Sequence, residues 1–224
     1  MENVVFRHEW KYPITMADVE VLRRKLCYVM KLDPHAINGQ YLIRSLYFDN
    51  FDDKALTEKL DGDYARSKFR IRIYNGSDAH IALEKKSKTG DLTQKHSARL
   101  TRQQYEQIVQ GDIQWLRDDG RAVLAELYYR MTAENMRPKT IVEYTRYPFI
   151  YEPGNVRVTL DHHIKTGVFS VDLFGAQKLA PAAAPHVLEV KYDAFLPDVI
   201  AGLVNYVGRG RASVSKYAAC RVYG

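Results

Sequence analysis

Apolar and polar residues alternate strictly in several stretches of the chain, most clearly in residues 66–74. This stretch reads Arg-Ser-Lys-Phe-Arg-Ile-Arg-Ile-Tyr, and successive side chains of a strand point to opposite faces. One face therefore carries a row of cations, namely Arg66, Lys68, Arg70 and Arg72. Like charges side by side are unfavourable unless an anion neutralises them. The pattern predicts a strand whose polar face meets an anion.

Seven further stretches predict strands with one apolar and one polar face. They span residues 4–12, 41–48, 79–86, 92–100, 139–147, 155–161 and 187–193. The pair Asn75-Gly76 favours a two-residue hairpin turn between the strands at 66–74 and 79–86. Lysine and arginine dominate the polar faces, with single glutamates at Glu9, Glu84 and Glu189.

Apolar residues spaced three and four apart predict amphipathic helices between these strands. The helices are expected at about 16–30, 51–60 and 113–134, after Thr101 and from about Pro197. Thr15 and Asp18 form a capping pair for the first helix. A turn is expected at His162-His163, and a metal site is not, because adjacent strand residues point to opposite faces. Together these elements predict one α+β domain over residues 1–224, dominated by antiparallel strands.

Two arrangements of the strands fit this pattern. In an open sheet, each charged face would simply be wetted by solvent, as is common for antiparallel sheets. However, wet faces normally mix charges of both signs, whereas cations dominate here. The alternative, which we favour, is an eight-stranded antiparallel β-barrel with a basic interior, whose apolar outer faces are covered by the amphipathic helices.

The net charge of +6 indicates an acidic partner. Nucleic acid, anionic lipid, nucleotide and inorganic polyphosphate all fit this charge. The two cysteines, Cys27 and Cys220, are far apart and predict reduced thiols in a cytoplasmic protein. No apolar run approaches the roughly 20 residues of a membrane span, and no signal peptide is evident. Membrane contact is therefore expected only through a partner or the basic surface.

Several chemistries lack their motifs. The chain has no phosphate-binding Gly-x-x-x-x-Gly-Lys loop, no Gly-x-Ser-x-Gly elbow and no His-Glu-x-x-His sequence. The 16 tyrosines could stack on single-stranded nucleic acid, but many fall on apolar strand faces, so no specific nucleic acid is expected. The glutamates among cations suit Mg²⁺ or Mn²⁺, which prefer oxygen ligands. For Glu9, an ion pair with Lys11 is an equal alternative.

Seven short motifs occur in an order that resembles a known family. They are Glu-Trp-Lys-Tyr (9–12), Arg-Ser-Leu-Tyr-Phe-Asp (44–49), Lys-Phe-Arg-Ile-Arg-Ile-Tyr (68–74), Leu-Glu-Lys-Lys (83–86), Arg-Val-Thr-Leu-Asp (157–161), Leu-Glu-Val-Lys-Tyr (188–192) and Ser-Lys-Tyr (215–217). Together they resemble the VTC domain, the polyphosphate polymerase of the vacuolar transporter chaperone complex, and its bacterial relatives. That domain belongs to the triphosphate tunnel metalloenzymes of the CYTH-like superfamily. The resemblance implies an eight-stranded tunnel, ATP as phosphoryl donor, Mn²⁺ or Mg²⁺ as cofactor and polyphosphate as product.

The resemblance also implies roles for particular residues. The triphosphate ligands at the reacting centre would be Lys11, Arg70, Arg72, Lys86 and Arg146. Further substrate contacts would come from Lys59, Lys95, Tyr144, Ser215 and Lys216, and the basic strand faces add Lys68 and Arg157. Glu189 resembles the metal-binding glutamate. Two positions depart from the family pattern. Lys59 stands in place of an arginine, which keeps the charge but loses the bidentate guanidinium. Ser213 stands in place of a lysine, and Arg209 or Arg211 could supply the missing charge.

We therefore expect phosphoryl transfer by positioning and charge neutralisation. The acceptor would be orthophosphate or the end of a polyphosphate chain, which is already ionised and needs no general base. Two alternatives remain open at this point. One is a hydrolase of the same fold that acts on tripolyphosphate or nucleoside triphosphates. The other is a non-catalytic module that binds polyphosphate or RNA with steep salt dependence. The sequence does not predict the oligomeric state.

Overall fold

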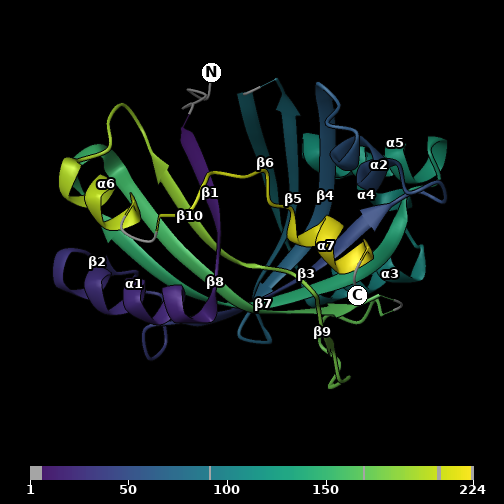
Figure 1. Ribbon diagram of the computed structural model, residues 1–224. Coiled ribbons are helices and arrows are strands. Elements are labelled where there is room, and N and C mark those ends of the chain that lie inside the picture. Colours follow the sequence, from purple (N-terminus) through teal and green to yellow (C-terminus); the bar gives the residue numbers. More distant parts are fainter. Residues whose placement is uncertain (1–6, 91, 169, 206–207, 223–224) are drawn as a thin grey trace. The chain divides into compact units, whose positions relative to one another are not determined.

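The structure is a computed structural model that describes residues 7–90, 92–168, 170–205 and 208–222 (Figure 1). Its strands are β1 (His8–Ile14), β2 (Lys31–Leu32), β3 (Tyr41–Asp49), β4 (Ala65–Tyr74), β5 (Ser77–Thr89), β6 (Leu92–Leu100), β7 (Arg137–Tyr151), β8 (Val156–Gly167), β9 (Ala180–Pro181) and β10 (His186–Tyr192). Its α-helices are α1 (Met16–Val29), α2 (Lys54–Leu60), α3 (Arg102–Gln110), α4 (Gln114–Asp118), α5 (Ala122–Ala133), α6 (Asp198–Asn205) and α7 (Lys216–Val222). The α+β class with antiparallel strands and flanking helices is confirmed.

The eight long strands are hydrogen-bonded in the order β1-β10-β8-β7-β3-β4-β5-β6. The short strands β2 and β9 pair with β7 and β8. All eight predicted strands are present, although residues 4–6 of the first one lie outside the described residues. The order ends at β1 and β6, and the described pairings do not join these two strands. The enclosed basic interior stays a prediction.

The chain divides into two compact units, and each is described by itself. Unit 1 comprises Met1–Leu42, Tyr144–Ile164 and Ala183–Lys216, whereas unit 2 comprises Ile43–Glu143, Lys165–Ala182 and Tyr217–Gly224. Unit 1 contains β1 and β10, and unit 2 contains β4, β5 and β6. The single domain over residues 1–224 stays a prediction.

In unit 1, the apolar strand faces are covered by helix α1. Val19, Leu22 and Leu26 of this helix are fully buried in one cluster with strand residues such as Leu160 and Leu188. Each such side chain contributes about 1.5–3 kcal/mol by leaving water. The predicted cap is confirmed, because the Asp18 amide donates to Thr15 Oγ1 at 3.2 Å and the Thr15 amide donates to Asp18 Oδ2 at 2.9 Å.

In unit 2, the apolar face of β4, β5 and β6 packs against helices α3, α4 and α5. Phe69 and Ile71 of β4 are fully buried in one cluster with Leu124 and Leu127 of α5. The predicted hairpin is confirmed: Asn75 and Gly76 join β4 to β5 with φ angles of 53° and 68°. Both are positive, as a type I′ turn requires. The apolar face of β4, β5 and β6 is thus buried in the core, and the cations lie on the opposite face of these strands.

Two details differ from the sequence predictions. The helical region at 113–134 is two helices, α4 and α5, with Gly120 between them at a φ of 91°. The turn predicted at His162-His163 is wrong, because both residues lie within β8. His163 adopts a φ of 50°, and this left-handed conformation brings its Nδ1 within 2.7 Å of His162 Nδ1. No helix in the described part of the chain has the length and apolarity needed to cross a membrane.

Candidate functional site

The polar face of β4, β5 and β6 in unit 2 is rich in cations, and we call it the basic ladder. Lys68 of β4 lies directly opposite Lys86 of β5, which in turn lies opposite Lys95 of β6. One step along the ladder, Arg66 lies opposite Lys88. Like charges directly opposite one another destabilise a sheet. Their persistence across three strands indicates a surface suited to a polyanion.

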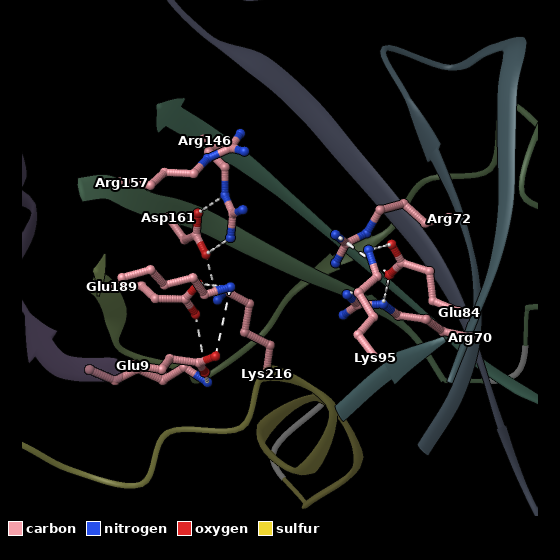
Figure 2. A network of polar contacts seen from close by, with 12 residues as sticks. Glu9, Arg70, Arg72, Glu84, Lys95, Arg146, Arg157, Asp161, Glu189 and Lys216 are labelled. Carbon is pink, nitrogen blue, oxygen red and sulfur yellow. Dashed lines mark hydrogen bonds and ion pairs between the residues drawn. The ribbon is translucent and has the colours of Figure 1, made fainter. Parts of the chain in front are cut away.

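Glu84 is a buried carboxylate within the basic ladder (Figure 2). Its Oε2 accepts hydrogen bonds from Arg70 Nε at 2.8 Å and forms an ion pair with Arg70 Nη2 at 2.7 Å. Its Oε1 lies 2.5 Å from Lys95 Nζ, and Arg72 Nη1 lies 3.8 Å from Oε2. Although burial raises the pKa of Glu84, Arg70, Arg72 and Lys95 outweigh burial and hold it far below its usual range. The three cations therefore favour the ionised form of Glu84.

Aromatic and hydroxyl groups orient the other cations of unit 2. Tyr47 on β3 accepts a hydrogen bond from Arg70 Nη1 at 2.9 Å, and Ser45 Oγ accepts from Arg72 Nε at 3.3 Å. The Lys68 ammonium lies 5.0 Å from the centre of the Tyr217 ring, within the range of a cation–π contact. By contrast, Lys59 lies in the last turn of α2 rather than on the ladder. The structure thus gathers the predicted cations of β4, β5 and β6 on one face of the sheet.

The polar faces of β1, β10 and β8 in unit 1 carry both signs of charge, and we call this surface the mixed ladder. Lys11 of β1 lies opposite Glu189 of β10, which lies opposite Thr159 of β8. Lys11 Nζ is 2.8 Å from Glu9 Oε1 and 3.6 Å from Glu189 Oε2, which confirms the predicted ion pair with Glu9. Lys191 Nζ is 2.9 Å from Glu189 Oε1. Burial raises the pKa of Glu189, but Lys191 and Lys11 outweigh it and hold it well below its usual range.

Asp161 is the most buried carboxylate of unit 1, and it engages two of the predicted site residues (Figure 2). Its Oδ1 and Oδ2 accept the Nε and Nη2 donors of Arg146 at 2.6 and 2.7 Å. Lys216 Nζ lies 2.6 Å from Oδ2 and 4.7 Å from the centre of the Tyr144 ring. Burial raises the pKa of Asp161, but Arg146 and Lys216 lower it overall. The same Asp161 raises the pKa of Arg146 well above its usual value, against the effect of burial.

The remaining predicted contacts of unit 1 are less central. Arg157 Nη2 donates to Asp33 Oδ2 and to the Tyr41 hydroxyl, both at 2.7 Å. The Ala212 amide donates to the Lys11 carbonyl at 2.9 Å, so the segment that leads to Ser215 runs beside β1.

The two arginines that could replace the lysine missing at Ser213 are both engaged within unit 1. Arg209 pairs with Asp18 at 2.9 Å, and the Arg211 guanidinium lies 3.4 Å from the centre of the Trp10 ring. Ser213 itself is exposed. Neither arginine contacts a carboxylate of the mixed ladder among the described interactions.

The oxygen atoms near Glu189 suit a hard divalent cation. Thr159 Oγ1 is buried and has no hydrogen-bond partner, and Thr159 lies directly opposite Glu189. Within the described ranges, no group of three or more His, Cys, Asp or Glu side chains is gathered to hold a metal. Mg²⁺ and Mn²⁺ often bind through one or two carboxylates and take their other ligands from phosphates and water. A single carboxylate with a neighbouring hydroxyl therefore fits a metal that arrives with a phosphate substrate.

Two residues central to these surfaces were absent from the predicted site, namely Glu84 and Asp161. Strand alternation already places Glu84 on the face of Lys86, and Asp161 on the face of Arg157. Their importance lies in their partners, which come from strands at a distance in the sequence. The signal in the sequence that could have identified them is a single acidic residue on a strand face that also carries cations.

An antiparallel α+β fold with basic and mixed polar ladders defines a class of protein suited to phosphate-rich anions. The sequence profile of the VTC domain matches residues 6–223, so the chain belongs to the VTC domain family. No curated protein matches the chain.

Solved structures with the same fold share little sequence with this chain. A candidate adenylate cyclase from Bacillus halodurans is 12% identical, with 92% of each chain covered and a TM-score of 0.53. The PH1012 protein from Pyrococcus horikoshii is 12% identical, with 97% of this chain and 99% of that chain covered and a TM-score of 0.52. A candidate adenylate cyclase from Vibrio parahaemolyticus is also 12% identical, with 95% and 96% covered and a TM-score of 0.50. At this identity the similarity shows the fold alone.

Proposed function

We propose that this chain is a polyphosphate polymerase that transfers the γ-phosphoryl group of ATP to a growing polyphosphate chain. The observation that carries the proposal is the row Lys68, Lys86 and Lys95, three lysines directly opposite one another on consecutive strands. A chain of phosphates supplies regularly spaced negative charge along such a row. Membership of the VTC domain family supports the same substrate class.

In this proposal, the basic ladder holds the phosphates. Arg70 and Arg72 stabilise charge that develops on the transferring group, and Lys86 and Lys95 neutralise neighbouring phosphates. Arg70 is held by Glu84 and Tyr47, so its guanidinium is oriented before the substrate binds. Preorganised cations of this kind lose little energy to rearrangement during the reaction.

Glu189 of the mixed ladder is the proposed holder of Mn²⁺ or Mg²⁺, with Thr159 as a neighbouring oxygen. Such an ion would supply positive charge that neutralises the phosphates of the substrate. Lys11 and Lys191 keep Glu189 ionised, which is the form that a metal requires. Lys11, Arg146, Arg157 and Lys216 are then the phosphate-binding cations of unit 1, together with Tyr144 and Ser215.

The proposed acceptor is orthophosphate or the terminal phosphate of the chain. Its attacking oxygen is already ionised near neutral pH, so no side chain has to remove a proton. The chain's own residues bind, orient and neutralise the reactants. This assignment agrees with two ladders built from cations, carboxylates and hydroxyl groups.

The test is incubation of the purified full chain with ATP and Mn²⁺, followed by gel electrophoresis and phosphate analysis. Long polyphosphate chains support the proposal. Release of orthophosphate alone identifies the rival hydrolase, which differs in allowing water to reach the γ-phosphate. Tight, salt-sensitive polyphosphate or RNA binding without turnover identifies a binding module. Because two structural neighbours are named as candidate adenylate cyclases, the same products are checked for cyclic AMP.

A further inference from the structure

Arg70 has an oxygen partner from this chain at each of its three guanidinium nitrogens. Nε and Nη2 contact Glu84 Oε2 at 2.8 and 2.7 Å, and Nη1 donates to the Tyr47 hydroxyl at 2.9 Å. The second oxygen of Glu84 contacts Lys95 Nζ at 2.5 Å. These contacts engage three of the five guanidinium N–H donors, so a phosphate that approaches Nε or Nη2 competes with Glu84 for Arg70.

The carboxylate of Glu84 is well placed to compete with a bound anion. Only 4% of the residue is exposed, and it already lies among three cations contributed by two other strands. Charge-assisted hydrogen bonds are roughly twice as strong as neutral ones. Because Glu84 belongs to the chain, it also loses no translational freedom on binding these cations, unlike an ion from solution.

We propose that Glu84 is a specificity-determining residue: a built-in carboxylate that excludes single phosphate ions from the Arg70 subsite and leaves the site to phosphate chains. This inference rests on the proposed function, because it assumes that the basic ladder binds polyphosphate. An orthophosphate ion at this subsite competes with Glu84 for Arg70 and has few other cations within its reach. A chain of three phosphates also reaches the row Lys68, Lys86 and Lys95, so the Arg70 subsite contributes a smaller share of its binding.

The expected consequence is that free orthophosphate competes poorly with phosphate chains for the Arg70 subsite. Orthophosphate and a polyphosphate chain offer the same kind of oxygen atoms, so charge and hydrogen bonding at one subsite cannot distinguish them. A resident anion at that subsite imposes the distinction, since only a ligand with additional contacts outweighs it.

The experiment is isothermal titration calorimetry of the full chain with orthophosphate and with tripolyphosphate at constant ionic strength. Glu84→Gln retains the shape of the side chain and removes its charge. We expect orthophosphate to bind at least about tenfold more tightly to this variant, in line with the loss of charge-assisted bonds. The gain for tripolyphosphate should be several times smaller.

A matched control is Glu126→Gln in the same unit. Glu126 Oε1 pairs with Lys85 Nζ at 2.5 Å, and Lys85 lies opposite Phe69 on the apolar side of the ladder. This variant loses a comparable ion pair and should leave binding of both anions unchanged. Orthophosphate affinity that is unchanged or weaker in a folded Glu84→Gln variant overturns the proposal, and so does an equal gain for both anions.

A second pair of variants keeps the test decisive if Glu84→Gln does not fold. Lys95→Met removes one cation at the exposed end of the network, where the lysine side chain is 54% exposed. Lys95→Met is then compared with the double variant Lys95→Met/Glu84→Gln. The double variant has one cation fewer than Glu84→Gln, so the repulsion among the remaining cations is weaker. The double variant should bind orthophosphate more tightly than Lys95→Met, and equal or weaker binding contradicts the proposal.

The proposed function and this inference fail in distinguishable ways. If the wild type binds tripolyphosphate but makes no chains from ATP, the polymerase is ruled out and Glu84 is still judged on binding alone. If the wild type does not bind tripolyphosphate, both proposals fail together.

Discussion

The two units differ in how carboxylates balance the cations on their polar strand faces. On the basic ladder of unit 2, the buried carboxylate of Glu84 is shared by Arg70, Arg72 and Lys95. On the mixed ladder of unit 1, Glu9 and Glu189 alternate with Lys11 and Lys191 across adjacent strands. This difference indicates that an anion-binding surface is recognised by an excess of cations over carboxylates, and not by the presence of charged residues alone. Our proposal accordingly assigns the phosphates mainly to unit 2 and the metal to the carboxylates of unit 1.

The largest expected effect concerns the fully buried Asp161 of unit 1. Asp161→Ala leaves Arg146 and Lys216 without their counter-ion, and breaking a buried pair typically costs about 3–5 kcal/mol. Urea denaturation should show this loss in the free energy of unfolding. Asp118→Ala is the control, because Asp118 and its partner Arg117 are exposed and solvent screens such surface pairs. Similar losses in the two variants would falsify the structural role assigned to Asp161.

The next effect concerns the basic ladder and turnover of ATP. Alanine at Arg70, Arg72 or Lys86 should each reduce turnover by about 10²–10³-fold, as expected for a group that stabilises developing charge. The measurement is the initial rate of product formation with ATP and Mn²⁺. Arg102→Ala is a control, since Arg102 pairs with Glu106 on helix α3 at 2.6 Å. Full activity in all three ladder variants would remove the basic ladder from the reaction.

A smaller effect concerns the buried His162 of unit 1. Burial, with the neighbouring His163 and His186, lowers the pKa of His162 to about 4. Asp161 and Glu20 act in the opposite direction and are outweighed. The unfolded chain takes up a proton near pH 6.5, whereas the folded chain does not until about pH 4. The contribution of His162 to stability is therefore complete above pH 6.5 and is lost as the pH falls toward 4.

The measurement is the free energy of unfolding at pH 6.5 and at pH 5. His162→Phe retains a ring to stack on Tyr147 and should lose about 1–2 kcal/mol less than the wild type over this interval. His96→Phe on the exposed surface of β6 is the control for the replacement of a histidine by phenylalanine. An identical pH dependence in wild type and His162→Phe would show that His162 does not cause the acid sensitivity.

The smallest effect concerns metal binding by the mixed ladder. Glu189→Gln should weaken Mn²⁺ binding in the presence of tripolyphosphate by about tenfold, because affinity depends on ligand charge. Glu9→Gln should have less effect, since Glu9 is engaged by Lys11 at 2.8 Å. Calorimetry of Mn²⁺ against both variants checks this, with EDTA-treated protein as the starting state. Equal weakening by the two variants would contradict the assignment of Glu189 as the particular metal ligand.

Much of the fold could be predicted because its signals are local. The cap at Thr15, the turn at Asn75-Gly76 and the alternation in β4 each depend on residues a few positions apart. Local signals failed at His162-His163, where the left-handed backbone of His163 turns two adjacent rings toward each other. Alternation assumes regular strand geometry, and one unusual φ angle removes that assumption.

The sequence by itself determined which face of each strand carries cations, because side chains alternate with a period of two wherever the backbone is extended. Only the tertiary structure decided which carboxylate meets which cation. Glu84 meets Arg70 through the β4–β5 register, and Asp161 meets Lys216 from a segment 55 residues further along the chain. A one-residue slip in register would move every partner to the opposite face, so these pairings depend on the packing of the whole unit rather than on any local pattern.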